Sequence, residues 1–422
     1  MRFDGPLNLA RWVIWGTAIL IIAVLPLVFT GSTFAITFMS QIGTFVIFAL
    51  AYNMLLGQGG MLSFGHAVYS GLGAYFAIHV LNLIGKGAVV FPVTLLPLVG
   101  GIAGIVFGLL FGYVTTKKSG TTFAMISLGI GEMVFACSLM FPAFFGGEGG
   151  VTTNRVVGGS FLGITYGPGI QVYYLIAVWA LLCTAGMFAF TQTPLGRMAN
   201  AVRDNPERAE FVGYDTQMVR FLTLVVSSFF AGVSGGLSAI NFEIVSAENV
   251  SALRSGGVLF ATFIGGTGFF FGPIIGGIIF MFFVVALSGF TKAWQLYLGL
   301  FFLLMVLYAP GGVASLIMRH LALAGTGLLR RLRWPYAVAG SAGILLIAAL
   351  IAAVEMTYHL SGEGLDEPTM ALAGMVLDPR AATPWFVVAV IAAAGFLTLA
   401  KTRGMVQSAW DDINDELERR RA

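Results

Sequence analysis

Long apolar runs alternate with short charged clusters along this chain. Most of the runs have about the 17–25 residues that a helix needs to cross roughly 30 Å of hydrocarbon. The pattern therefore predicts an all-α polytopic membrane protein with about 10–12 transmembrane helices. The expected spans are 12–29, 34–56, 66–84, 92–114, 121–145, 171–191, 219–240, 254–267, 273–290, 294–309, 335–357 and 384–400, of which 254–267 is unusually short.

The basic clusters between the runs predict the orientation of the chain. They lie at 117–118, 193–220, 319–333 and after Lys401. With both termini in the cytoplasm, every one of these clusters is cytoplasmic, as the positive-inside rule requires. We therefore expect a multi-pass protein of the cell inner membrane. The first apolar run has no convincing cleavage site after it and is expected to remain as the first helix.

Composition excludes a soluble globular domain. Hydrophobic residues make up 58% of the chain and charged residues only 10%, and 56 of the 422 residues are glycine. Abundant glycine suits membrane helices that pack closely or break. Cys137 and Cys183 both lie in apolar runs, so we expect two small packed side chains and neither a disulfide framework nor a metal site.

The chain is expected to have four parts. Residues 1–318 form a transport core that includes a cytoplasmic segment at 193–220, and 319–334 is a basic cytoplasmic linker. Two extra transmembrane helices follow at 335–400, and 401–422 is a helical cytoplasmic tail. The tail is either a solvated helix or a surface for a partner or the membrane.

The segment 193–220 is a charged island between two apolar runs. It has four basic and four acidic residues, and a loop that only joined two helices would need far fewer residues. We expect it to fold against a soluble partner. The charged residues are Arg197, Arg203, Arg208, Arg220, Asp204, Glu207, Glu210 and Asp215.

Glycines interrupt an apolar region at 57–66. Their poor helix propensity predicts a broken or unwound helix there. Non-helical backbone at membrane depth survives when it is buried in protein or lines a water-filled path. The stretch is therefore either a lining of the translocation path or a tight turn before a closely packed helix. The candidate path residues are Gly57, Gln58, Gly59, Gly60, Ser63 and His66.

A second interruption lies at 264–273. Pro273 cannot continue a hydrogen-bonded helix, and Gly265 and Gly266 precede it. Interrupted segments in both halves of a transporter point to a substrate path between them. We add these three residues to the candidate path.

Glu132 lies near the middle of the run 121–145. A charge at that depth costs about 2.5–3.5 kcal/mol on insertion scales. Glu132 is therefore protonated, paired or facing a polar path, or it makes a structural hydrogen bond to a neighbouring helix, and we include it among the candidate path residues. Glu243, Glu248 and Arg254 are expected at the outer ends of their spans, where they face solvent or an external binding protein.

The motifs of several enzyme and channel classes are missing from the sequence. It has no G-x-x-x-x-G-K-[ST] phosphate loop, no H-E-x-x-H motif and no metal-ligand spacing. We expect no enzymatic activity and no cofactor bound by this chain.

Several segments together resemble branched-chain amino acid ABC transporter permeases of the LivM type, in the LivH/LivM family. The resemblance covers about residues 10–315 in the expected order. It is carried by LAYNMLLGQGGMLSFGHAVYSGLGAY, SLGIGEMVFA, GGEGGV, GRMANAVRDNPERAEFVGYD, GGTGFFFGPIIGG and WQLYLGLFFLLMVLYAPGGV. The two extra C-terminal spans are not part of the usual family core.

The resemblance implies a set of partners. They are a second permease in a hetero- or pseudo-dimer, two cytoplasmic ABC ATPase subunits that bind ATP and Mg²⁺, and an extracytoplasmic solute-binding protein. The family's coupling pattern corresponds to Glu207, Arg208, Ala209 and Gly213, and Arg208 departs from it at the first alanine. The expected ATPase-coupling residues are Arg197, Arg203, Asp204, Glu207, Arg208, Ala209 and Gly213.

We therefore expect a permease subunit of an ATP-driven importer for branched-chain amino acids or related small solutes. The main alternative is a stand-alone secondary transporter or facilitator with Glu132 as its coupled site. A membrane-anchored scaffold is a third class, which explains the tail but not the glycine breaks.

Overall fold

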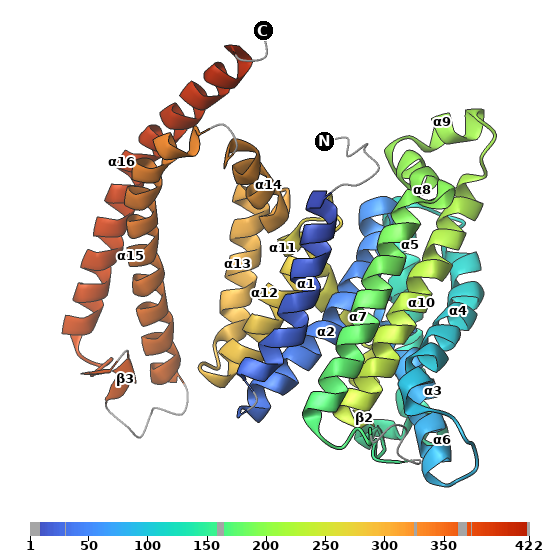
Figure 1. Cartoon of the computed structure of the whole chain (residues 1–422). Coiled ribbons are helices and arrows are strands. Elements are labelled where there is room, and N and C mark those ends of the chain that lie inside the picture. Colours follow the sequence, from blue (N-terminus) through green and yellow to red (C-terminus); the bar gives the residue numbers. More distant parts are fainter. Residues whose placement is uncertain are drawn as a thin grey trace. The chain divides into compact units, whose positions relative to one another are not determined.

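A computed structural model describes residues 9–29, 31–157, 164–324, 327–361, 369–372 and 374–419 (Figure 1). In these ranges nine helices are long and apolar enough to cross a membrane, and a bent pair, Trp294–Tyr308 with Gly312–Leu323, makes a tenth span. The remaining two expected spans correspond to shorter apolar helices, Trp15–Val28 and Ala252–Gly265. The predicted all-α polytopic fold is confirmed.

The elements follow the apolar runs closely. The principal helices are α1 (Leu9–Val28), α2 (Thr33–Asn53), α3 (Ala67–Gly85), α4 (Leu96–Thr115), α5 (Gly120–Met140), α6 (Pro142–Phe145), α7 (Gly169–Gln192), α8 (Pro194–Asp204), α9 (Pro206–Phe211), α10 (Thr216–Phe242), α11 (Ala252–Gly265), α12 (Gly272–Met281), α13 (Trp294–Tyr308), α14 (Gly312–Ala324), α15 (Leu329–Ser361) and α16 (Ala382–Arg419). Two short antiparallel ribbons pair β1 (Val151–Thr152) with β2 (Ile244–Val245) and β3 (Met370–Leu372) with β4 (Met375–Leu377).

The chain divides into two compact units. Unit 1 comprises Met1–Ala286 and Phe301–Ser315, and unit 2 comprises Leu287–Leu300 and Leu316–Ala422. The division falls within α13 and α14, so it does not coincide with a single linker. Much of the basic stretch 319–334 is helical, because α14 runs to Ala324 and α15 begins at Leu329. The four-part organisation expected from the sequence stays a prediction.

Unit 1 is built around α3, α4 and α10, which lie side by side. Their backbones meet at glycines, because a Cβ on Gly73 would lie 2.7 Å from the Cα of Gly232. Gly100 of α4 also packs directly against the carbonyl of Gly232. Small residues allow this approach, which gives helices in lipid the close packing that holds them together. α8 and α9 lie at one end of these spans, and β2 and α6 lie at the other (Figure 1).

Unit 2 contains α15 and α16, which pack along each other and are connected through the β3–β4 ribbon. The Glu355 carboxylate of α15 accepts hydrogen bonds from the Thr291 hydroxyl (2.6 Å) and the Tyr297 hydroxyl (2.9 Å). α16 continues as one helix through the expected tail to Arg419. Its Ile413 is fully buried, in a cluster with Leu323, Leu328 and Leu332. The tail is therefore anchored on one face.

The glycine crossing in unit 1 leads to a stability prediction. We expect Gly232→Ala to lower the free energy of unfolding by about 1–3 kcal/mol, because the new methyl group must displace backbone. Gly340→Ala in α15 is the matched control, since no atom lies within 4 Å of its Cβ position. Thermal unfolding of both variants in mild detergent measures the difference. Equal midpoints would contradict the close crossing.

Candidate functional site

The two glycine breaks meet in unit 1. α2 changes to a π-helix at Met54–Gln58 and ends there, and the chain stays non-helical until α3 begins at Ala67. α11 ends at Gly265 and α12 begins at Gly272. A Cβ on Gly57 would lie 2.5 Å from the Thr267 carbonyl oxygen. The sequence predicted both breaks, and the structure brings them into direct contact.

The glycines of the second break have specific conformational roles. Gly266 has a φ of +107°, which strongly favours glycine. Gly265 packs on the carbonyl of Gly272, so a side chain there would collide with backbone. Pro273 occupies the first turn of α12, where its missing N–H removes no helical hydrogen bond. The break therefore joins a helix that ends at Gly265 to one that begins at Gly272 through closely packed glycine backbone.

Side chains satisfy the non-helical backbone at 59–66. The Tyr52 hydroxyl donates to the Ser63 carbonyl oxygen (3.1 Å), and the Phe64 N–H donates to the Ser127 hydroxyl of α5 (3.1 Å). The Ala67 N–H donates to the Ser255 hydroxyl of α11 (2.9 Å). Since hydrocarbon offers no partners, these bonds are what allow an irregular segment at this depth.

The charged segment folds as two short helices. Thr193 caps α8, its hydroxyl accepting from the Gly196 N–H (3.2 Å), and Asn205 caps α9 by accepting from the Arg208 N–H (2.9 Å). Proline opens each helix, at the position where no N–H is needed. The Asp215 carboxylate then caps α10. The local sequence therefore determines where α8, α9 and α10 begin.

Arg203 connects the charged segment to the first break. Its Nη1 donates to the Gly57 carbonyl oxygen, and its Nε donates to the Asp204 carboxylate (2.8 Å). Gly60 has a φ of +65°, and a Cβ there would lie 2.6 Å from the Arg203 Cγ. Of the predicted coupling residues, Arg203 thus contacts the predicted path directly.

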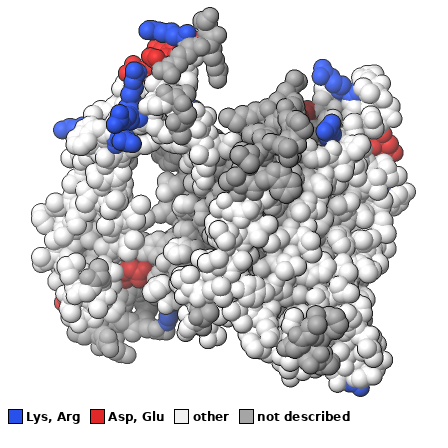
Figure 2. All heavy atoms as spheres, in the orientation of Figure 1, with Lys and Arg blue, Asp and Glu red and all other residues white. Residues whose placement is uncertain are grey.

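The rest of the charged segment has one buried and one open side. Ala209 is buried with Ala199, Val202 and Val219, which attaches α9 to α8 and α10. Phe211 and Val212 are 91% and 70% exposed, although both are apolar. Both basic and acidic side chains are visible at this end of unit 1 (Figure 2). Of the predicted coupling residues Ala209 is buried, and the exposed ones are Arg197, Arg203, Asp204, Glu207, Arg208 and Gly213.

The polar residues of the first break are buried. Gln58, Ser63 and His66 are each at most 9% exposed. His66 packs against the rings of Phe48, Tyr52 and Tyr69, with its Nε2 3.4 Å from the Ser227 hydroxyl. Their side chains are therefore largely shielded from solvent by the described part of the chain. Their assignment to the translocation path stays a prediction.

Glu132 is exposed in the middle of α5. Within the described residues its carboxylate has no hydrogen-bond or ion-pair partner. The structural hydrogen bond considered from the sequence is therefore not formed inside this part of the chain. The Glu132 carboxylate therefore has no polar partner among the described helices of this chain.

The expected position of Arg254 was wrong. It lies in the first turn of α11, which begins beside α3, since a Cβ on Gly71 would lie 2.6 Å from the Asn249 carbonyl oxygen. The Arg254 side chain is half-buried over the Phe48 ring, 6.0 Å from its centre. Hydropathy did not reveal that the chain turns inward before Ala252. Glu243, in contrast, pairs with Arg155 (3.7 Å) beside the β1–β2 ribbon.

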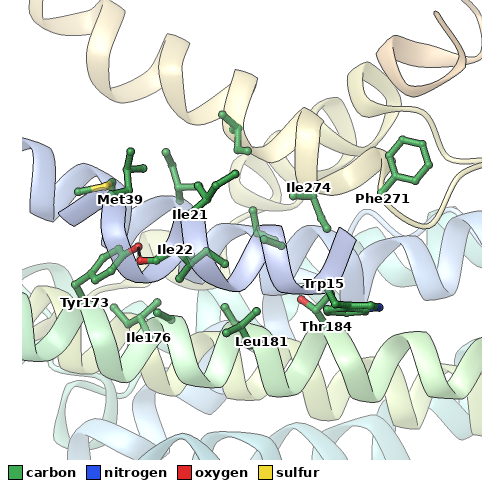
Figure 3. Close-up of a pocket in the computed structure, with 18 of the residues that line it drawn as sticks. Trp15, Ile21, Ile22, Met39, Tyr173, Ile176, Leu181, Thr184, Phe271 and Ile274 are labelled. Atoms are coloured by element: carbon green, nitrogen blue, oxygen red, sulfur yellow. Dashed lines mark hydrogen bonds between the residues drawn. The ribbon is translucent and has the colours of Figure 1, made fainter. Parts of the chain in front are cut away.

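A second candidate site is an apolar cavity of about 820 Å³ between α1, α2, α7 and α12. Figure 3 shows Trp15, Ile21, Met39 and Ile274 around it. Among the described lining residues the side-chain polar groups are the hydroxyls of Tyr173 and Thr184 and the indole N–H of Trp15, and Tyr173 already donates to the Ile22 carbonyl oxygen (2.8 Å). A solute with charged groups would lose hydration there without compensation. We therefore place the candidate site at the breaks.

Broken spans in contact with an exposed charged segment define a polytopic membrane transport protein. A family model described as "Branched-chain amino acid transport system / permease component" matches residues 34–309. The chain belongs to this family of permease components.

Curated relatives agree with this family. The chain is similar to the high-affinity branched-chain amino acid transport system permease protein LivM of Escherichia coli (strain K12), at 27% identity over 72% of this chain and 76% of the relative. It is also similar to BraD of Pseudomonas aeruginosa (23%, covering 56% and 79%) and to a probable LivH of Methanocaldococcus jannaschii (26%, covering 56% and 74%). No solved structure matches the chain. The stand-alone transporter is not favoured by these similarities.

The contact between Arg203 and the first break can be tested with a matched pair of glycines. Gly60→Ala and Gly87→Ala both place alanine at positive φ, which costs roughly 1–2 kcal/mol. Only Gly60→Ala also displaces Arg203, because no atom lies within 4 Å of the Gly87 Cβ position. We expect trypsin to cleave after Arg203 several-fold faster in Gly60→Ala, measured by mass spectrometry of the detergent-purified protein. Equal cleavage rates in the two variants would contradict the contact.

Proposed function

We propose that this chain is the permease subunit of an ATP-driven importer for branched-chain amino acids or related small solutes. The observation that carries the proposal is the exposed segment around α9, which Arg203 connects to the broken α2. A transporter driven by its own ion gradient would have no use for such a segment. The similarity to permease proteins of branched-chain amino acid transport systems supports the solute class.

The importer requires several further subunits. We propose a second permease that completes the pathway, two cytoplasmic ATPases that hold ATP and Mg²⁺, and an extracytoplasmic binding protein that delivers the solute. This chain would then catalyse no reaction itself. The proposed cellular location is the inner membrane, with both termini cytoplasmic. Residues 1–8 and 420–422 lie outside the described part of the chain.

The open side of α9 has the composition of a docking surface. Apolar Phe211 and Val212 form its centre, and Glu207 and Arg208 lie beside them. An apolar centre with a charged rim is the usual anatomy of a protein–protein interface. A soluble ATPase that buries Phe211 would gain apolar burial, and the charges would fix its orientation.

Closure of the ATPases would then act on the membrane spans through α8. Displacement of α9 would move α8, because Ala209 packs on Ala199 and Val202. α8 would move the Gly57 carbonyl through Arg203. The segment 59–66 has no regular helix to resist this movement. Outward and inward access would correspond to two arrangements of α8 and the segment 59–66. Ligand binding would change the relative populations of these two arrangements.

Docking can be tested by variants of the exposed face. We expect Phe211→Asp, Glu207→Arg and Gly213→Trp each to weaken ATPase binding by about tenfold or more, or about 1.4 kcal/mol. Uptake should fall while the amount of protein in the membrane stays normal. Co-purification of an ATP-hydrolysing subunit in mild detergent measures the binding.

Phe290→Asp is the matched control, since Phe290 is 89% exposed but lies outside α8 and α9. It should keep the ATPase bound. Normal ATPase recovery and normal uptake in all three α9 variants would refute the docking role. Solute movement by the purified chain alone, without ATP, would instead support the stand-alone transporter.

A further inference from the structure

Glu132 is exposed near the middle of its span, where contact between its charge and lipid would be energetically costly. It is the 13th of the 21 residues of α5, so it lies at the middle of a predicted span. A charge at the centre of a bilayer costs several kcal/mol unless it faces a water-filled path or another polar group. The exposed side of α5 at Glu132 therefore faces protein or water in the assembled transporter.

Arg254 lies at the same level of the fold as Glu132. The short segment 64–67 fixes this relation, because it touches both α5 and α11. Gly65 packs against the backbone of Ser127 and Gly131, and the Ala67 N–H bonds to Ser255. Glu132 follows Gly131 in the chain, and Arg254 precedes Ser255. Two opposite charges thus flank one four-residue segment without forming an ion pair with each other.

The surroundings of Arg254 favour an additional anion. α3 begins at Ala67 and α11 at Ala252, so two helix N-termini with partial positive charge meet at this level. The Nε of Arg254 is buried without a partner in the described part of the chain. His66 and Ser70, which are 0% and 1% exposed, likewise have a ring nitrogen and a hydroxyl without partners there. Unpartnered buried polar atoms require an explanation, and a bound polar ligand supplies one.

Apolar surface adjoins both charges. Met133 follows Glu132 and is 49% exposed, and Leu253 precedes Arg254 and is 85% exposed. An aliphatic side chain could pack on these residues while the charged atoms of the same molecule meet the two charges. A small zwitterion with an aliphatic side chain combines these features.

We propose that Glu132 and Arg254 form a transient binding site for a zwitterionic aliphatic amino acid within the translocation path. The Glu132 carboxylate accepts hydrogen bonds from the ammonium group, and the Arg254 guanidinium binds the carboxylate, the pairing that arginine makes best. This inference rests on the proposed function and adds a solute contact in the permease itself. The two residues neutralise the solute's charges as it crosses the middle of the membrane.

The test uses the complete importer in proteoliposomes, with its binding protein and ATP at saturation. Uptake of radiolabelled L-leucine and hydrolysis of ATP are measured together. We expect Glu132→Gln and Arg254→Gln each to lower uptake by about tenfold while ATP hydrolysis stays within about twofold of the unmodified importer. Arg254→Lys, which keeps the charge, should retain more uptake than Arg254→Gln.

Charge reversal gives a sharper comparison. We expect Glu132→Arg and Arg254→Glu to abolish uptake singly, and the double variant to recover part of it, because a zwitterion can bind the exchanged pair in the opposite orientation. Glu148→Gln and Lys118→Gln are controls, since they remove exposed charges outside this level and should leave uptake unchanged.

The outcomes separate this inference from the proposed function. If the unmodified importer does not transport leucine, the proposed solute class is wrong. If it does, and both glutamine variants transport normally, the zwitterion site is refuted. Loss of ATP hydrolysis together with uptake would also refute it, because the residues would then act in assembly and not on the solute.

Discussion

Every break in a membrane helix exposes backbone groups that hydrocarbon cannot satisfy, and the arrangement of unit 1 follows from how these groups are paired. The segment 59–66 is bonded by Tyr52 from α2 and Ser127 from α5, and Ser255 of α11 takes the Ala67 N–H that follows it. Arg203 of α8 takes the Gly57 carbonyl. Four helices are therefore held around one irregular segment by these bonds, and loss of any one bond would leave a buried group unpaired.

The same requirement explains why glycine is concentrated at the breaks. Backbone that bonds to side chains of neighbouring helices must approach those helices closely. Gly57 lies against the Thr267 carbonyl, and Gly65 lies against the backbone of α5. A methyl group at either position would separate the partners and break the bonds that the irregular segment needs. Close packing and hydrogen bonding thus both require a residue without a side chain at these positions.

The sequence predicted most spans, both breaks and the charged segment, because each leaves a local signal. Hydropathy marks helices, glycine and proline mark interruptions, and charge marks surfaces. Arg254 was misplaced for the same reason. That α11 begins beside Gly71 depends on contacts between residues far apart in the chain, and no local pattern encodes depth. The bond from Arg203 to Gly57 was equally invisible, although both residues had been singled out separately.

These contacts form a continuous physical route from the exposed face of α9 to the irregular segment between α2 and α3. Ala209 packs on α8, Arg203 of α8 holds Gly57, and the segment beyond Gly57 ends between α5 and α11. Glu132 and Arg254 lie where the route ends. Since each link is a packed or hydrogen-bonded contact, a displacement of α9 would be passed along these contacts to the irregular segment. Within the described residues of this route, the irregular segment 59–66 can change conformation without breaking a regular helix.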